Sequence, residues 1–268
     1  MDNSSTEIQI EEPIDKTSTH RFRNLVAQIV YFKEIDSTNS FLKQKAQKDA
    51  AEEGLCIVAS RQTAGRGRMD RTWHSPEEGL YFSILLKPNL ALNFVSLITL
   101  MAAVATAESV EAFSHSPVDI KWPNDIIIER RKVSGILTEA TFEKQKLGYV
   151  VVGIGVNLNQ KTFPKELASQ ATSLYLESGQ VIDREAFLLY LISRIDHWYG
   201  VLLTAPSAIV QRWQQLSTYA YGKEIFVEID AKKVAVKTSG VEASGALRVE
   251  TADGKVHILY GGEVLEGR

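Results

Sequence analysis

The alternation of hydrophobic and polar positions predicts a chain in which short strands and longer helices are interspersed. Short apolar runs bounded by polar or glycine-containing segments are typical of strands buried in a sheet. Such runs lie at Val26–Phe32, Leu55–Ser60, Leu80–Leu86, Val118–Lys121, Asp125–Arg130, Lys132–Phe142 and Gly148–Asn157. Pro123 supplies no backbone N–H, so we expect a bend between the two strands that flank it.

Longer segments between these strands carry the signals of helices. Asp36–Asn39 offers side-chain oxygens that can cap a helix, and Gly54 is placed to end that helix after about Ala51. Asn93–Phe113 has little polar surface, which predicts a largely buried helix. Two further helices are predicted at Arg184–Leu203, with Asp183 as its cap, and at Ser207–Ser217.

The pattern changes after Gly222, where short strands follow one another with Gly or Asp-Gly turns between them. They lie at Lys223–Asp230, Lys232–Thr238, Ala246–Glu250 and Val256–Tyr260. We therefore predict a flexible polar tail over residues 1–20, a main domain over residues 21–220 and a small all-β domain over residues 221–268. A module of that size has a thin core, so we expect it to lean on the main domain.

Composition and charge narrow the class of protein. The 268 residues are 44% hydrophobic and 24% charged, which is ordinary for a globular protein. A net charge of -3 and an isoelectric point near 6.0 give no general attraction to nucleic acid. The longest apolar stretch, around Phe94–Ala107, contains polar residues and predicts no membrane span. The polar N-terminus shows no secretory signal, and the single Cys56 lies in an apolar run, so we expect a cytoplasmic protein.

Candidate chemistry is concentrated in the polar loop Arg61–Glu78. Gly65-Arg66-Gly67-Arg68 and the nearby Arg71 place three arginines within six positions of a glycine-containing segment. Guanidinium groups suit phosphate and carboxylate oxygens, and glycines let backbone amides approach an anion. Trp73 can stack on a purine or on an arginine. Composition alone fits a solvated basic loop equally well, and neither a Walker A motif nor a dinucleotide fingerprint is present.

Three further segments combine cations, amides and glycines. They are Lys121-Trp122-Pro123-Asn124-Asp125, then Lys132 before the strand that contains Gly135, and Gly153-Ile154-Gly155-Val156-Asn157. Glycine inside a strand often marks the close approach of a ligand or of another backbone. Each segment alone is a weak signal, because a lone lysine at the start of a strand is more often a solvated surface residue.

Taken in order, these segments and Ser37-Thr38-Asn39 resemble the motif series of biotin protein ligases of the monofunctional type, which lacks an N-terminal DNA-binding domain. The resemblance runs from about residue 25 to the C-terminus. It implies an α+β fold with a mixed β-sheet packed by helices, similar to the class II synthetase core. It also implies a small C-terminal β-barrel like that of Src-homology-3 domains, with which the predicted all-β domain agrees independently.

The resemblance also implies roles for single residues. Those expected to bind biotin are Ser37, Thr38, Asn39, Gln62, Gly65, Arg66, Gly67, Arg68, Lys132, Gly135 and Gly155. Those expected to bind ATP or the adenylate are Arg66, Arg68, Arg71, Trp73, Lys121, Asn124, Lys132 and Asn157. The expected catalytic residues are Lys132, Arg68, Asp125 and Lys121, and Asp125 is also the candidate ligand for Mg²⁺. One of the Ser-Thr-Asn residues is expected to cap the following helix as well.

The segment Gly65–Arg71, called the arginine loop below, departs from the family pattern at Met69-Asp70, where relatives often have glycine. Asp70 adds a negative charge that could pair with a neighbouring arginine. The expected activity is formation of biotinyl-5′-adenylate from biotin and ATP, followed by transfer of biotin to a lysine of a biotin carboxyl carrier protein. Asp125 is the candidate acceptor of the lysine proton, unless it only positions cations or the metal.

Three other functions fit these segments less well. A lipoate or octanoate ligase on the same core is not expected to carry the Gly-Arg-Gly-Arg and Lys-Trp-Pro-Asn-Asp segments together. A biotin-responsive repressor needs a helix-turn-helix, which the residues before the first strand are too few to form. A non-catalytic biotin binder would not need the cations expected around the phosphates. An exposed sheet edge could support a homodimer or docking of the carrier.

Overall fold

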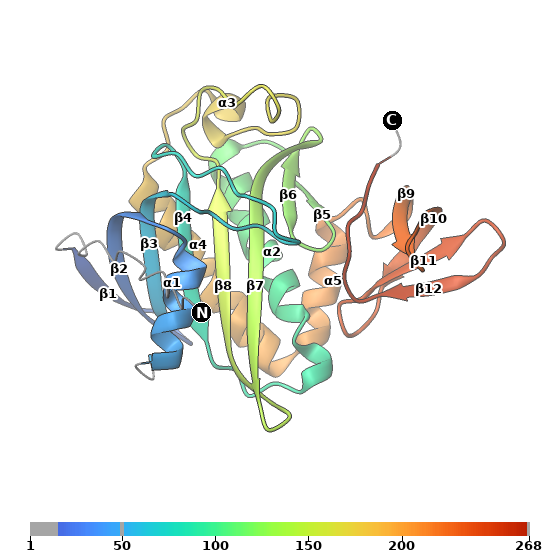
Figure 1. Cartoon of the computed structure of the whole chain (residues 1–268), viewed down its shortest axis with the longest axis horizontal. Helices are drawn as coiled ribbons and strands as arrows, with labels where there is room; N and C mark the ends of the chain where they lie inside the picture. Colours follow the sequence, from blue (N-terminus) through green and yellow to red (C-terminus); the bar gives the residue numbers. More distant parts are fainter. Residues whose placement is uncertain (1–15, 49–50, 267–268) are drawn as a thin grey trace, which may run out of the picture.

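The computed structural model describes residues 16–48 and 51–266, and its main feature is an eight-stranded mixed sheet (Figure 1). The strands are β1 (Thr17–Arg21), β2 (Val26–Ile35), β3 (Leu55–Gln62), β4 (Leu80–Leu86), β5 (Asp119–Lys121), β6 (Asp125–Ile128), β7 (Arg131–Glu143) and β8 (Lys146–Val156). Their order across the sheet is β1-β2-β3-β4-β8-β7-β6-β5. β2 and β3 pair in parallel and every other neighbouring pair is antiparallel, so the sheet is mixed, as predicted.

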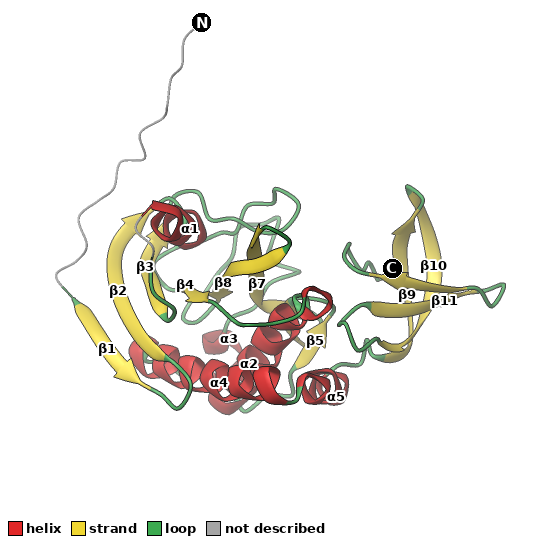
Figure 2. Cartoon of the chain, turned by 90° about the horizontal axis from the view of Figure 1, so that it is seen from below, coloured by secondary structure: helices red, strands yellow, loops and turns green. Residues whose placement is uncertain are grey.

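Helices cover both faces of this sheet (Figure 2). α1 (Thr38–Lys48) packs on β3, β4 and β8 on one face. α2 (Leu97–Ser114), α4 (Arg184–Thr204) and α5 (Pro206–Leu216) pack together on the other face, and a 3-10 turn at Leu92–Phe94 precedes α2. The short α3 (Leu174–Ser178) was not predicted, because five residues are too few to show helical periodicity. Asp183 caps α4 as expected, since its side chain accepts a hydrogen bond from the Ala186 amide.

The hydrophobic segment that contains α2 is a core element. Leu92–Ser114 is long and apolar enough to cross a membrane by length and composition alone, and 67% of its most apolar window is buried in the protein. α2 lies between the sheet and the α4–α5 pair, which explains the all-round apolar pattern read from the sequence. Buried core helices of soluble proteins have the same character.

A second, four-stranded antiparallel sheet follows α5. It consists of β9 (Tyr221–Ile229), β10 (Lys232–Val241), β11 (Leu247–Thr251) and β12 (Val256–Leu259), in the order β12-β11-β10-β9. Leu265 pairs with Phe226 and continues the ladder beyond β9. The core is continuous between the two sheets, and Trp122 Nε1 donates to Gly245 O at 3.2 Å. The small domain therefore rests on the main one, as its thin core required.

At the N-terminal end, the described residues differ from the prediction. Residues 17–20, expected in the flexible tail, belong to β1, where Thr17 pairs with Val30 and Arg21 with Val26. β1 is an edge strand of polar residues, held by its backbone ladder, and it carries no apolar alternation that a sequence could reveal. The rest of the predicted tail, up to residue 15, lies outside the described residues.

Candidate functional site

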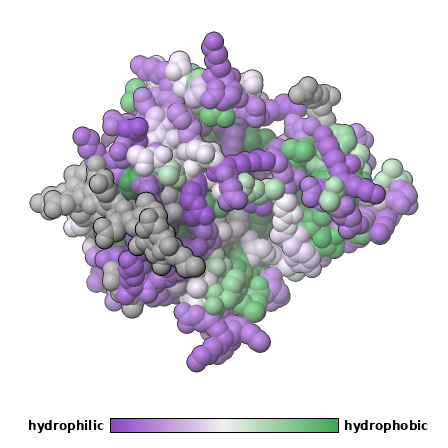
Figure 3. Space-filling view, in the orientation of Figure 1, coloured by the Kyte–Doolittle hydropathy of each residue, from purple (hydrophilic) through white to green (hydrophobic). Residues whose placement is uncertain are grey.

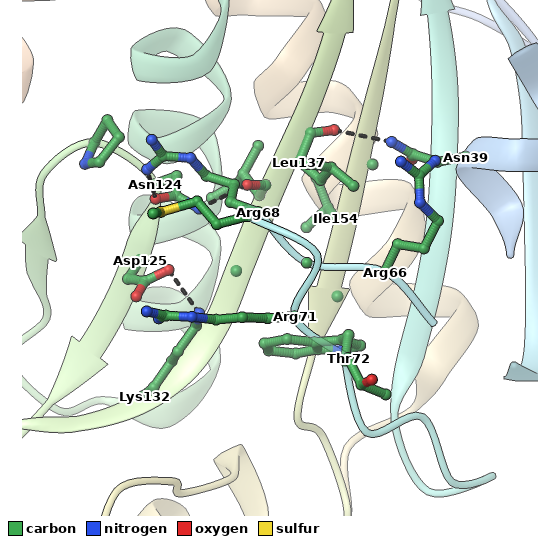
Figure 4. Close-up of a pocket in the computed structure, with 18 of the residues that line it drawn as sticks. Asn39, Arg66, Arg68, Arg71, Thr72, Asn124, Asp125, Lys132, Leu137 and Ile154 are labelled. Atoms are coloured by element: carbon green, nitrogen blue, oxygen red, sulfur yellow. Dashed lines mark hydrogen bonds and ion pairs between the residues drawn. The ribbon is translucent and has the colours of Figure 1, made fainter. Parts of the chain in front are cut away.

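One cavity of about 150 Å³ gathers the predicted motifs (Figure 4). It lies where the N-terminus of α1, the arginine loop, the strands β6 to β8 and the segment 262–264 of the small domain meet. The predicted site residues that line it are Ser37, Thr38, Asn39, Gln62, Arg66, Gly67, Arg68, Arg71, Trp73, Lys121, Asn124, Asp125, Lys132, Gly135 and Gly155. Of the predicted set, only Gly65 and Asn157 do not line it.

One end of the cavity is polar and built around Thr38. The Thr38 amide donates to Gln62 Oε1 at 2.8 Å, and Gln62 Nε2 donates to Ser75 Oγ at 3.0 Å. Ser37 both lines the cavity and accepts a long 3.5 Å contact from the Ser40 amide, so it combines pocket wall and helix cap. Ser37, Thr38 and Asn39 are buried although polar, and such groups require hydrogen-bond partners.

Strand glycines make room for three of the site's side chains, those of Asn39, Trp73 and Lys132. A Cβ atom at Gly153 would lie 1.9 Å from Asn39 Oδ1, and one at Gly155 would lie 2.4 Å from Trp73 Nε1. A Cβ atom at Gly135 would meet Trp73 and Lys132 at 3.0 Å. The strand glycines were expected to mark close approach of a ligand or a backbone, and the structure shows that side chains make the approach instead. Gly65 has a related role, since a Cβ there would lie 2.5 Å from Trp73 O.

The arginine loop folds back on itself as a small hairpin. Gly67 N donates to Arg71 O at 2.7 Å, and Arg71 N donates to Arg68 O at 3.2 Å. Met69 and Asp70 at its tip have φ values of +54° and +56°, the left-handed region that a type I′ turn requires at both central positions. Glycine adopts this left-handed conformation without a Cβ clash, so Met69 and Asp70 occupy positions that favour glycine. Among the described residues, no ion pair involves Asp70, so its predicted pairing with an arginine is not seen.

The arginines of the loop contact both the main domain and the small domain. Arg66 lies 3.2 Å from Glu139 on β7, and Arg68 donates to Asn124 Oδ1 at 2.9 Å. Arg68 also donates to Gly262 O at 3.2 Å, and Arg71 Nη1 donates to Glu263 Oε1 at 2.8 Å. Burial lowers the pKa of the Arg68 guanidinium and the charge of Asp125 opposes that shift. The loop thus spans the cavity from the main sheet to the small domain.

Lys132 and Asp125 form the charged centre of the cavity. Lys132 Nζ lies 2.7 Å from Asp125 Oδ1 and 5.1 Å from the centre of the Trp73 ring (Figure 4). Trp73 Nε1 is buried without a hydrogen-bond partner, which leaves one donor at the wall of the site. The lining contains three arginines and two lysines against two carboxylates, those of Asp125 and Glu263. An excess of cations around a partly buried cavity suits an anionic ligand.

A second cavity of about 380 Å³ adjoins the first and shares Arg71, Trp73, Lys121, Asp125 and Lys132 with it. It adds apolar walls from Ile127, Phe163, Leu167, Ala171 and Tyr219. Asn157 lines this second cavity, but its Nδ2 donates to Thr172 O at 2.9 Å. The Asn157 side chain therefore also anchors the segment after β8 that carries Phe163, Leu167 and Ala171.

Several residues of the site were not predicted. Glu139 anchors Arg66, Ser83 contacts Thr38 and Asn39, and Gly262 and Glu263 close the cavity from the small domain. Glu139 ends a motif segment that the sequence did display, Lys132–Glu139. The other three lie outside every motif, and only the folded chain brings them to the site.

Comparisons with known proteins agree on one family. The model of the Biotin/lipoate A/B protein ligase family matches residues 31–157. The "Bifunctional ligase/repressor BirA" of Bacillus spizizenii is 35% identical over 239 residues, covering 88% of this chain and 73% of that protein. The "Biotin--[acetyl-CoA-carboxylase] ligase" of Paracoccus denitrificans is 29% identical over 220 residues, covering 79% and 90%.

A solved structure shows the same arrangement of elements. The biotin protein ligase from Aquifex aeolicus in complex with biotin and ATP matches with a TM-score of 0.75 and 32% identity. The match covers 88% of this chain and 97% of that chain, so it extends over both sheets.

Proposed function

This chain belongs to the biotin protein ligase family, and we propose that it forms biotinyl-5′-adenylate from biotin and ATP and transfers biotin to a lysine of a carrier protein. The observation that carries the proposal is that one cavity joins the polar Ser-Thr-Asn segment to the arginine loop and the Lys132–Asp125 pair. Such a pocket suits a ligand with a neutral polar ring and a carboxylate beside a nucleotide phosphate. The apolar walls of the adjoining cavity, next to Trp73, suit the adenine base.

The first step joins two anions. A carboxylate oxygen of biotin attacks the α-phosphorus of ATP, the mixed anhydride forms, and pyrophosphate leaves. Arg68, Lys121 and Lys132 line the cavity where these charges meet, and they stabilise negative charge on the phosphoryl oxygens. Because the substrate itself supplies the nucleophile, the protein contributes positioning and electrostatic stabilisation.

Mg²⁺ fits this site through a single carboxylate. Within residues 16–48 and 51–266, no cluster of three or more His, Cys, Asp or Glu side chains could hold a metal ion by itself. Mg²⁺ is commonly held by one or two carboxylates together with substrate phosphates, and Asp125 can supply that carboxylate. Bound with ATP, the ion would neutralise charge on the phosphate oxygens.

In the second step the amine of a carrier lysine attacks the carbonyl carbon of the anhydride, the amide bond forms, and AMP leaves. The amine must lose a proton, and Asp125 is the carboxylate placed beside Lys132 at the charged centre of the cavity. We assign the proton-accepting role to Asp125. The carrier proposed is a biotin carboxyl carrier domain of the acetyl-CoA carboxylase type, which the name of the Paracoccus relative supports.

We also propose a barrel-like C-terminal domain, a relationship of the main sheet to the class II synthetase core, and a role for the β1 edge in assembly or docking. The Phe226–Leu265 pairing extends the four-stranded sheet and supports closure toward an Src-homology-3-like barrel. The mixed sheet with helices on both faces supports the relationship to the class II synthetase core. The β1 edge could support a homodimer or docking of the carrier. We propose a cytoplasmic protein that needs neither nucleic acid nor a membrane.

The decisive experiment combines radiolabelled biotin, MgATP and a biotin carboxyl carrier domain, with separate reactions that lack ATP or carrier. We expect label on the carrier only when ATP is present, and pyrophosphate with protein-bound adenylate when the carrier is absent. Because the matching family model also covers lipoate ligases, parallel reactions contain lipoate or octanoate. Activation of either acid without activation of biotin would refute the proposal, and biotin binding without adenylate would indicate a binding protein.

A further inference from the structure

We infer that Ser83, a residue of β4 that does not line the cavity, is a positioning residue that sets the hydrogen-bond direction of the biotin end. This inference rests on the proposed function and names a further determinant of specificity at that site. Ser83 is fully buried near the middle of the larger sheet. Its Oγ lies 2.7 Å from Thr38 Oγ1 and 2.6 Å from Asn39 Oδ1. The Ser83 hydroxyl therefore joins Thr38 and Asn39, both of which line the cavity, from behind the cavity wall.

The orientation of the Asn39 amide follows from its other partners. Asn39 Nδ2 lies 3.1 Å from both Leu137 O and Glu139 Oε2, and both of these atoms can only accept hydrogen bonds. The nitrogen must therefore face β7, and Oδ1 must face Ser83. A Cβ at Gly153 would fall 1.9 Å from Oδ1, so the carbonyl is held tightly against β8. Asn39 Oδ1 needs a donor, and Ser83 provides it.

The proton of Thr38 is then fixed as well. The single Ser83 proton is used on Asn39, so the 2.7 Å contact between the hydroxyls is a hydrogen bond only if Thr38 donates to Ser83. The alternative acceptor for the Thr38 proton is Gln62 Oε1 at 3.2 Å, which already accepts from the Thr38 amide. Either acceptor lies within the protein. Because the contact with Ser83 is the shorter one and Gln62 Oε1 already has a donor, we assign the Thr38 proton to Ser83, and a directed chain runs from Thr38 through Ser83 to Asn39.

This chain determines what the cavity offers to a ligand. With its proton turned inward, the Thr38 hydroxyl presents only lone pairs, and it will recognise a ligand group that donates an N–H. The ureido ring of biotin carries two such groups. Without Ser83, Asn39 Oδ1 would be a buried acceptor lacking a donor, and such groups are strongly disfavoured. We expect Asn39 and Thr38 then to rearrange and the polar end to lose its selectivity.

The first test is Ser83→Ala, with Ser109→Ala as the matched control. Ser109 is also fully buried, and its Oγ donates to Ala105 O within α2, remote from the cavity. For Ser83→Ala we expect the KM for biotin to rise roughly tenfold, with the KM for ATP and kcat little changed. Calorimetric titration with biotin measures the same loss without turnover. Ser109→Ala is expected to keep the wild-type biotin affinity.

The second test is a double-mutant cycle with Thr38→Val, which removes the hydroxyl but keeps the side-chain shape. If Ser83 acts through Thr38 and Asn39, the affinity losses of the two single variants will not multiply in the double variant. A Ser83→Ala protein with wild-type biotin affinity, or losses that multiply fully, would overturn the inference. A wild-type protein that binds and activates no biotin would instead overturn the proposed function, so the two failures are distinguishable.

Discussion

Lys132 and Asp125 lie on adjacent strands, with Lys132 Nζ 2.7 Å from Asp125 Oδ1, and both side chains are part of the wall between the two cavities. A bulge between Ile126 and Ile127 shifts the register of β6 against β7 at this point. The pair therefore meets where the sheet is locally irregular, a common place for functional side chains. Each side chain is about one-third exposed or less, so neither is an ordinary surface charge.

Lys132 is the first residue to test. We expect Lys132→Gln to reduce the rate of biotinyl-adenylate formation by about 100- to 1,000-fold, because a cation at the reacting phosphate is lost. Pyrophosphate release from biotin and MgATP measures the rate. Lys146→Gln, at the exposed start of β8, serves as the control and should be unchanged. Equal rates for Lys132→Gln and wild type would remove Lys132 from the chemistry.

Asp125 is tested on the second half of the reaction. Asp125→Asn keeps the size of the side chain and removes its ability to accept a proton. Starting from preformed biotinyl-adenylate, we expect transfer to the carrier to slow by about 100-fold at neutral pH. Raising the pH should partly restore transfer, because more of the carrier amine is then already deprotonated. A wild-type transfer rate would mean that Asp125 only positions Lys132 or the metal.

The sequence predicted most of the sheet because its strands bury apolar side chains. β4 is buried along its whole length, and its run Leu80–Leu86 is continuously apolar apart from Ser83. β1 could not be predicted, because Thr17–Arg21 is polar and joins the sheet through its backbone pairing with β2. Secondary structure that depends on an edge ladder leaves no side-chain signature.

Prediction of the site had a similar limit. Residues within motifs, such as Arg68 and Lys132, were found because several cations and glycines occur close together in the sequence. Ser83 and Glu263 were missed, because each reaches the site only through the fold. Arg71 and Glu263 are 192 positions apart, and no local pattern marks such a pair.

Arg68 is predicted to retain the adenylate. Its guanidinium bridges Asn124 and Gly262 O, so it ties the arginine loop to the rim of the cavity. We expect Arg68→Ala to release biotinyl-adenylate at least about tenfold faster. A loop that is no longer anchored lets water enter the cavity and lets the adenylate leave it. Stopped-flow dissociation of preformed adenylate measures this rate. Arg248→Ala, at an exposed position of β11, is the control, and a wild-type rate for Arg68→Ala would contradict the lid role.

Gly155 is predicted to be required for the position of Trp73. An added Cβ would lie 2.4 Å from Trp73 Nε1 and 2.5 Å from Cε2, so the indole must move. We expect Gly155→Ala to raise the KM for ATP roughly tenfold or more, since the ring also faces Lys132. Gly148→Ala, on the same strand, has its nearest contact at 3.3 Å and should behave like wild type. An unchanged KM for ATP in Gly155→Ala would show that Trp73 does not contact the nucleotide.

Glu139 gives the protein a pH-dependent contribution to stability. Burial opposes ionisation of this carboxyl, but the hydrogen bond from Asn39 and the charges of Arg66 and Lys43 outweigh it, so the pKa lies below its ordinary 4.5. In the acid range the unfolded chain therefore binds more protons at this position than the folded protein does. The stabilisation is complete above pH 4.5 and is lost as the pH falls through the folded-state pKa.

Glu139→Gln should therefore lower the melting temperature at neutral pH and have little effect in acid. Because solvent screens the partly exposed cations, we expect a decrease of about 2 to 4 °C at pH 7, corresponding to roughly 1 kcal/mol. The difference between the two proteins should narrow as the pH falls below the ordinary 4.5 and through the folded-state pKa of Glu139. Glu143→Gln, on an exposed end of the same strand, should show neither effect. A difference that stays constant down to the lowest pH would mean that Glu139 acts through packing and not through its charge.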